Sequence, residues 1–308
     1  MTHTATADTA NADTDTADTA TRPPRFQRLG VVGCGQMGAG VAEIAAKAGL
    51  DVTVAVSSDD SRVRGLGRLT GSLARAVAKG RLSEAERDAA LGRITFTTSL
   101  EDLADRQVVI EAIVEHEPTK VELFTMLDKI VEDPQAVLAS NTSSLSIVRL
   151  ASATQNPGRV VGMHFFNPVT VLPLVELVGS VLTDEDTLDR AEHLVADVLG
   201  KSVIRTPDRA GFLVNALLFP YLLAAVRMVD NGFATAEVVD QGMVKGCSHP
   251  LGPLRLLDLI GLDTTVAIAE ALYAEHKEPL YAPPPLLLRM VEGGLLGKKT
   301  GRGFYTYA

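Results

Sequence analysis

A histidine and a glutamate in neighbouring apolar segments are the residues best suited to acid–base chemistry. His164 closes the apolar run 160–164, and Glu176 lies in the middle of the apolar segment 174–178. Histidine transfers protons readily near neutral pH, and a carboxylate on its other ring nitrogen fixes the tautomer. A charge in a buried strand is costly unless it is paired. Two interpretations are open: a catalytic pair, or a hydrogen-bonded core histidine and a glutamate on an edge strand.

A glycine-rich segment near the start of the chain has the spacing of a dinucleotide-binding loop. It reads Gly33-Cys34-Gly35-Gln36-Met37-Gly38, after a predicted strand and at the start of a predicted helix. The glycines allow a tight turn, close approach of a pyrophosphate and close helix packing, and the helix N-terminus directs N–H groups at the anion. We therefore expect a dinucleotide here; the alternative is a turn that serves packing only.

The acidic residue that usually completes this fingerprint is missing. It is expected at the carboxyl end of the second strand, where it binds the ribose hydroxyls. Val56 occupies that position, and Ser57 and Ser58 follow it. With no carboxylate to repel a 2′-phosphate, and with Arg62 and Arg64 close behind, the sequence predicts NAD or NADP as cofactor, with NADP accepted. Two alternatives are open: Asp59 or Asp60 supplies the ribose contact, or NAD binds without that contact.

The elements that position these residues alternate between strand and helix. Predicted strands, which are short and branched, cover 28–32, 52–56, 107–112, 137–139, 160–164, 174–178 and 202–205. Predicted helices between them cover 36–48, 61–79, 83–91, 118–131 and 185–199. This alternation indicates βαβ units, and hence an α/β fold with a Rossmann-type, mostly parallel sheet covered by helices on both faces.

The pattern becomes helical after residue 206. Predicted helices cover 211–230, 236–243, 263–273 and 286–292, followed by one predicted strand at 303–307. We therefore expect a dinucleotide-binding domain at 26–206 and an all-helical domain at 207–308. Residues 1–25 are rich in Thr, Ala and Asp and lack Val, Ile, Leu and Phe, so we expect a disordered tail, or alternatively a docking segment. The tail has no apolar core of a signal peptide.

Composition argues against several classes of protein. The net charge of −9 and the pI near 5.2 repel phosphate backbones, so no nucleic-acid partner is expected. No apolar run is long enough to cross a bilayer, so no membrane association is expected. Cys34 and Cys247 form neither a disulfide framework nor a metal-ligand spacing, so no metal site is expected. We expect a cytoplasmic protein.

Several motifs in order resemble the (S)-3-hydroxyacyl-CoA dehydrogenase family, with most similarity to its short bacterial members that act on 3-hydroxybutyryl-CoA. The segments that carry the resemblance are 33–38, 139–145, 162–168, 249–253 and 296–305. It covers residues 29–307. It implies an oxidoreductase that interconverts (S)-3-hydroxyacyl-CoA and 3-oxoacyl-CoA by hydride transfer with a nicotinamide cofactor, on short chains such as 3-hydroxybutyryl and acetoacetyl. The alternatives are the same chemistry on an acyl-carrier-protein substrate, and a non-catalytic dinucleotide-binding structural protein.

The resemblance assigns roles to individual side chains at the reacting centre. It implies that His164 is the base and that Glu176 orients it. It also implies two further catalytic and substrate-binding residues: Ser143, which hydrogen-bonds the substrate hydroxyl or keto oxygen, and Asn215, which lies near the reacting centre. The alternative role for Ser143 is to cap the helix that follows. Asn215 stands alone in an apolar predicted helix, so it needs a hydrogen-bond partner.

The resemblance also implies binding residues. The expected cofactor contacts, beyond the serines at the strand end, are Gly33, Gly35, Gln36, Met37, Gly38, Val56, Glu115, Lys120, Ser143, Asn167 and Lys299. The expected coenzyme A contacts are Ser72 and Lys79, which lie two turns apart on one helix face. Arg68, Arg75 and Arg81 add positive charge nearby, and a merely solvated basic face is the alternative. Relatives pair through the helical domain, so we expect a homodimer; apolar segments at 213–226 and 254–260 agree with this.

Overall fold

Strand pairing gathers seven of the predicted β segments and one further strand into an eight-stranded sheet. The computed structural model describes residues 26–307. Its strands run in the spatial order β3-β2-β1-β4-β5-β6-β7-β8. They are β1 (Arg28–Val32), β2 (Asp51–Ala55), β3 (Ile94–Thr97), β4 (Val108–Glu111), β5 (Val137–Ser140), β6 (Val160–Phe165), β7 (Leu174–Gly179) and β8 (Ser202–Pro207). All neighbours are parallel except β6 and β7, which are antiparallel.

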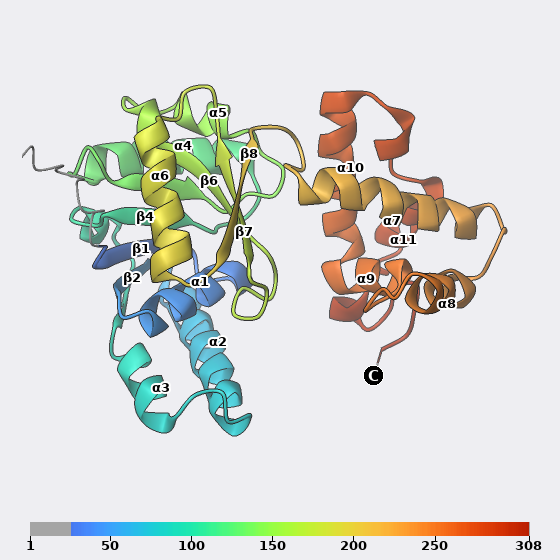
Figure 1. Ribbon diagram of the computed structural model, residues 1–308, viewed down its shortest axis with the longest axis horizontal. Coiled ribbons are helices and arrows are strands. Elements are labelled where there is room, and N and C mark those ends of the chain that lie inside the picture. The colour runs from blue at the N-terminus through green and yellow to red at the C-terminus, as the bar shows by residue number, and fades with distance from the viewer. Residues whose placement is uncertain (1–25, 308) are drawn as a thin grey trace, which may run out of the picture.

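Helices cover both faces of the sheet (Figure 1). They are α1 (Gln36–Lys47), α2 (Asp59–Ala78), α3 (Glu84–Leu91), α4 (Glu117–Ile130), α5 (Ile147–Ala151) and α6 (Glu185–His193). Successive strand residues alternate between the two faces, so Val31 joins the core under α1, α2 and α6 whereas Val32 joins the core under α4 and α5. The sheet is therefore buried on both sides, as parallel sheets are.

The remaining described residues form a separate group of helices beside the sheet (Figure 1). They are α7 (Val214–Asp230), α8 (Ala236–Gly246), α9 (Pro253–Ile260), α10 (Leu262–His276) and α11 (Pro285–Glu292). They enclose their own core, which includes Phe219, Leu223, Leu257 and Leu272. The expected fold class is confirmed: a Rossmann-type sheet followed by helices. No helix within 26–307 is both long and apolar enough to span a membrane.

The structure differs from the predicted elements in three places. Strand β3 was not expected, because it is a four-residue, partly exposed edge strand whose pattern is weak. Helix α9 was also not expected. The predicted strand at 303–307 is absent from the described residues: only single bridges form there, because the Asp258 carboxylate accepts the N–H groups of Phe304 and Tyr305. Residues 1–25, for which a tail was predicted, lie outside the described residues.

Candidate active site

His164 and Glu176 face each other directly across two strands. The antiparallel register of β6 and β7 pairs these residues, and the His164 Nδ1 atom lies 2.7 Å from Glu176 Oε2. Both side chains are buried, with 4% of His164 and none of Glu176 exposed. The Phe166 and Phe212 rings pack against the imidazole. The sheet therefore holds a histidine–carboxylate pair in a water-poor setting.

The second oxygen of Glu176 joins the two parts of the chain. Glu176 Oε1 accepts hydrogen bonds from the N–H groups of Leu213 (3.0 Å) and Val214 (2.9 Å), at the start of α7. The first N–H groups of a helix have no partner within the helix, and the helix dipole favours a negative charge there. One carboxylate thus orients the imidazole and anchors the first helix of the helical domain.

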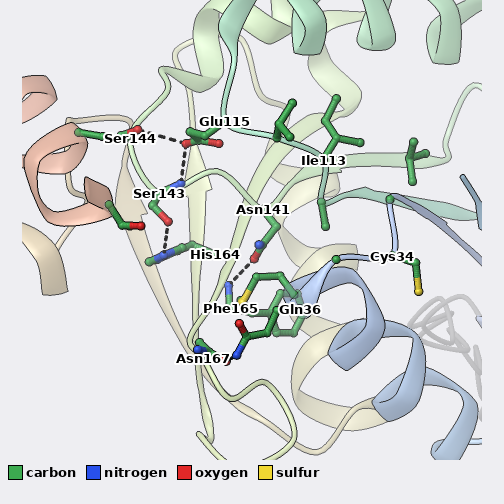
Figure 2. Close-up of a pocket in the computed structure, with 18 of the residues that line it drawn as sticks. Cys34, Gln36, Ile113, Glu115, Asn141, Ser143, Ser144, His164, Phe165 and Asn167 are labelled. Atoms are coloured by element: carbon green, nitrogen blue, oxygen red, sulfur yellow. Dashed lines mark hydrogen bonds between the residues drawn. The ribbon is translucent and has the colours of Figure 1, made fainter. Parts of the chain in front are cut away.

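Ser143 lies on the other side of the imidazole. Its Oγ is 3.2 Å from His164 Nε2 (Figure 2). The other ring nitrogen, Nδ1, is the one that contacts Glu176. It does not cap α5, because the Asp208 carboxylate accepts the N–H groups of Ile147 and Val148 instead. The Ser143 hydroxyl is therefore directed at the histidine, and its capping alternative is wrong.

A carboxylate after β4 shapes the turn that carries Ser143. Glu115 Oε1 accepts the Ser143 N–H and the Ser144 hydroxyl, each at 3.1 Å (Figure 2). It also accepts the Thr142 hydroxyl. Burial opposes ionisation of Glu115, but the Lys120 charge and these hydrogen bonds outweigh it and hold the pKa of Glu115 below its usual value. Glu115 also lines the central cavity of the protein, which extends from the glycine loop to His164.

Lys120 supports this turn from behind. Only 1% of it is exposed, and its Nζ lies 2.6 Å from Glu115 Oε2 and 3.1 Å from Glu111 Oε1. It is not among the residues that line the cavity. The structure therefore places Lys120 one layer away from the position expected for a cofactor contact, with Glu115 between it and the cavity.

The glycine loop has the geometry of a phosphate cradle. Gly33 has φ +93°, and a Cβ there would lie 2.7 Å from the Ala112 carbonyl oxygen. A Cβ on Gly38 would lie 2.0 Å from the Gly33 carbonyl oxygen, whereas one on Gly35 would meet open space. The loop packs tightly at its ends and is open in its middle, where α1 begins. Burial raises the pKa of the adjoining Cys34 thiol to about 11, so this thiol is inert at neutral pH.

One cavity of about 1400 Å³ connects the glycine loop with the histidine. Gln36 and Asn167 meet in its wall, where Gln36 Nε2 donates to Asn167 Oδ1 at 2.9 Å (Figure 2). Met37 lines the cavity beside them, and Asn215 lines it from the first turn of α7. The structure thus brings the predicted loop, histidine, serine and both asparagines to a single space.

The adenosine end of this cavity differs in detail from expectation. Val56 and Ser57 line it, but the Ser58 hydroxyl caps α2 by accepting the Ser61 N–H. Arg64 lines the cavity and donates to Ser61 Oγ at 3.0 Å. Arg62 does not line it and pairs with Asp59 at 3.0 Å instead. Of the two arginines expected near a 2′-phosphate, only Arg64 is placed there.

A second cavity of about 850 Å³ lies along α2 and contains both residues expected to meet coenzyme A. Ser72 and Lys79 line it. The other charged residues in its wall are Glu43, Lys47, Arg64, Arg68, Arg75 and Arg81. Within residues 26–307 none of these cations forms a salt bridge, so the wall carries a strong uncompensated positive charge.

Lys299, another expected cofactor contact, does not itself line the central cavity. Its Nζ is 2.6 Å from the carboxylate of Asp263, and Asp263 does line the central cavity. The helical side of that cavity is otherwise mainly apolar, with Leu218, Leu256 and Ile260 among its residues.

One residue that the sequence reasoning did not select also orders the site. Asn141 Oδ1 accepts the Phe165 N–H at 2.9 Å and so holds the chain directly after His164 (Figure 2). Its position at the carboxyl end of β5 was a usable signal, because ligand sites of open α/β sheets gather at that edge.

A dinucleotide loop and a glutamate-paired histidine that line one cavity define a nicotinamide-dependent dehydrogenase. The chain belongs to the 3-hydroxyacyl-CoA dehydrogenase family: residues 28–209 match the model of its NAD binding domain and residues 211–307 that of its C-terminal domain. It is 60% identical over 282 residues to a 3-hydroxybutyryl-CoA dehydrogenase of Mycobacterium tuberculosis, covering 92% of this chain and 99% of the relative.

Solved structures agree with this assignment. The crystal structure of M. tuberculosis FadB2 matches with a TM-score of 0.92 and 60% identity, covering 92% of this chain and all of that one. The (S)-3-hydroxybutyryl-CoA dehydrogenase PaaH1 of Ralstonia eutropha matches with a TM-score of 0.87 and 43% identity, over 92% of this chain and all of that one. The predicted family is therefore confirmed.

Proposed function

We propose that this protein is an NAD-dependent oxidoreductase that interconverts (S)-3-hydroxyacyl-CoA and 3-oxoacyl-CoA, with short chains such as 3-hydroxybutyryl and acetoacetyl as substrates. The observation that carries the proposal is that His164, paired with Glu176 and in contact with Ser143, lies in the same cavity as the glycine loop. The similarity to 3-hydroxybutyryl-CoA dehydrogenases supports the acyl chain length.

The residues present fit a dinucleotide. The open space at Gly35 and the free N-terminus of α1 suit a pyrophosphate. Gln36 of the loop is hydrogen-bonded to Asn167, three residues after the histidine, in the cavity wall. A nicotinamide held there would supply the hydride chemistry: it would accept hydride from C3 of the acyl group in oxidation and donate it in reduction. The chain's own side chains provide the proton transfer and the positioning.

His164 is the proposed base. Its Nδ1 is hydrogen-bonded to the Glu176 carboxylate, which favours the tautomer with the proton on Nδ1. In that tautomer Nε2 carries a free lone pair on the side of Ser143 and the cavity. Nε2 can then take the proton from the C3 hydroxyl during oxidation, and return it to the oxygen during reduction. The buried carboxylate stabilises the imidazolium formed in between.

Ser143 and Asn215 are proposed to hold the substrate oxygen. Ser143 Oγ is within hydrogen-bond distance of Nε2, so an oxygen bound beside it lies within reach of the base. Asn215 lines the same cavity from α7, and the first N–H groups of that helix are hydrogen-bonded to Glu176. Substrate groups bound by the helical domain are thereby held in register with the base on the sheet.

An assay of the purified protein with acetoacetyl-CoA and each reduced nicotinamide cofactor tests the proposal. We expect oxidation of the cofactor that depends on acetoacetyl-CoA, with 3-hydroxybutyryl-CoA as product. The same assay with acetoacetyl-acyl carrier protein distinguishes the two acyl carriers. No turnover with either carrier would refute the proposed function.

For the cofactor we propose that NADP(H) is accepted beside NAD(H). The support is that the end of strand β2 offers no carboxylate: Val56 and Ser57 line the cavity there, and Arg64 lines it as well. An arginine fork binds a phosphate well, and no carboxylate at the strand end repels it.

Val56→Asp should therefore shift preference toward NAD(H). The new carboxylate would bind the ribose hydroxyls and repel a 2′-phosphate, so the ratio of kcat/KM for NADPH to that for NADH should fall by roughly tenfold or more. Val56→Asn is the matched control, because it has the same shape without the charge. A parent inactive with NADPH would contradict acceptance, and an equal ratio in parent and Val56→Asp would show that this position does not discriminate.

We also propose a homodimer that forms through the helical domain. Large apolar side chains remain exposed there, including Leu217 at 72% and Phe233 at 77%, and such exposed groups indicate an interface. Light scattering at micromolar concentration should give twice the chain mass of 32.6 kDa. A mass of one chain would contradict the proposal.

A further inference from the structure

One face of α2 carries a row of polar and basic side chains that runs between the two cavities. Its members, separated by three or four residues and hence on one face, are Arg64, Arg68, Ser72, Arg75 and Lys79. The first two line both cavities, whereas the other three line only the second. The helix is therefore a shared wall, and its N-terminal half borders both spaces.

Arg68 is held at a position where it lines both cavities. Its Nη1 donates to the Cys34 carbonyl oxygen at 3.2 Å, which anchors the guanidinium on the glycine loop. A guanidinium has five N–H donors, so four remain. In the part of the chain that the structure describes, Arg68 forms no salt bridge and no second hydrogen bond. A cation fixed in this way and left unpaired is ready for an anion.

Anions are expected on both sides of this residue. On one side, the anchoring carbonyl is next to Gly35, the open position of the loop where a pyrophosphate is expected. On the other side, the second cavity presents Lys47, Arg75, Lys79 and Arg81, against the single carboxylate of Glu43. That balance suits the phosphates of coenzyme A.

We propose that Arg68 is a phosphate-binding residue shared by the two ligands: toward the first cavity it binds the pyrophosphate of the dinucleotide, and toward the second a phosphate of coenzyme A. The inference rests on the proposed function, which places these ligands in the two cavities. The dinucleotide fingerprint does not itself require an arginine, since backbone N–H groups suffice there. Arg68 adds one charge that serves both sites.

Binding measurements on Arg68→Leu test this sharing. Fluorescence titration with NADH and calorimetric titration with coenzyme A give the two Kd values separately, with no need for turnover. We expect each Kd to rise roughly tenfold, because a charge-assisted hydrogen bond is lost at each site. The salt dependence of both Kd values should also weaken, because salt screens a charge contact. A mere distortion of the glycine loop would leave the salt dependence as in the parent.

Two neighbouring arginines provide matched controls. Arg75→Leu removes a charge that lines only the second cavity, so the Kd for coenzyme A should rise while that for NADH stays constant. Arg62→Leu removes a charge that pairs with Asp59 and lines neither cavity, so both Kd values should stay constant. Thermal unfolding of each variant verifies the fold. If Arg68→Leu proves unstable, Arg68→Lys takes its place: it keeps the charge and should retain part of both affinities.

The outcomes separate this proposal from the proposed function. A parent that binds neither NADH nor coenzyme A would refute the proposed function. A parent that binds both, with an Arg68→Leu variant that loses affinity for only one ligand or for neither, would refute the sharing alone. If Arg62→Leu loses as much affinity for both ligands as Arg68→Leu does, the effect comes from the overall charge of the protein, and the sharing is refuted as well.

Discussion

Replacing His164 with alanine is expected to lower kcat by roughly 10²–10⁴-fold in both directions of the reaction, the usual contribution of a positioned general base. The variant loses the Nε2 atom, which lies 3.2 Å from Ser143 Oγ. Steady-state rates with acetoacetyl-CoA and NADH, and with 3-hydroxybutyryl-CoA and NAD, give the measurement. The Kd for NADH should change little, because the glycine loop that would bind the phosphates is untouched.

A His164→Ala variant whose kcat stays near the parental value in either direction would exclude His164 as the base.

Glu176→Gln is expected to lower kcat by about 10²-fold or more, although the change preserves shape. Glu176 accepts on one oxygen from the α7 N–H groups and contacts His164 Nδ1 with the other. A glutamine has one acceptor oxygen and one NH₂ group. If its oxygen stays with the two N–H groups of α7, its NH₂ faces His164 Nδ1 and stabilises the tautomer that carries the proton on Nε2. That tautomer cannot accept the hydroxyl proton.

The opposite placement of the glutamine is less favourable, because its NH₂ would face the Leu213 and Val214 N–H groups. The measurement is kcat in the oxidation direction together with the thermal unfolding midpoint. Loss of rate with a parental midpoint supports the tautomer argument, whereas a parental rate would remove Glu176 from the mechanism. Glu115→Gln is a useful comparison, since that carboxylate shapes the Ser143 turn without touching His164.

Much of the fold was predictable because its signals are local. The glycine spacing at 33–38 and the alternation of short branched runs with helices are properties of contiguous residues. Seven of the observed strands fall on predicted ones within about two residues at each end. Strand β3 was missed because an edge strand is stabilised by its one neighbour, β2, rather than by its own pattern.

The candidate site was only partly predictable, because its geometry depends on contacts between distant segments. The sequence shows that His164 and Glu176 are unusual in apolar runs, but the antiparallel register of β6 and β7 is what places them face to face. Likewise, neighbours in sequence can end in different surroundings: Arg64 faces the cavity, whereas Arg62 points to Asp59, since a helix turns about 100° per residue.

The sequence by itself therefore determined the α/β class, the dinucleotide loop and the residue types available for proton transfer, because each of these depends on residues that are close together along the chain. Only the tertiary structure decided which of these side chains meet. It enclosed Lys120 between two carboxylates, directed Ser143 to the histidine instead of to a helix, and set Arg68 between two cavities. The physical reason is that hydrogen bonds and ion pairs act over a few ångströms, and chain segments far apart in sequence come that close only through the packing of the sheet and its helices.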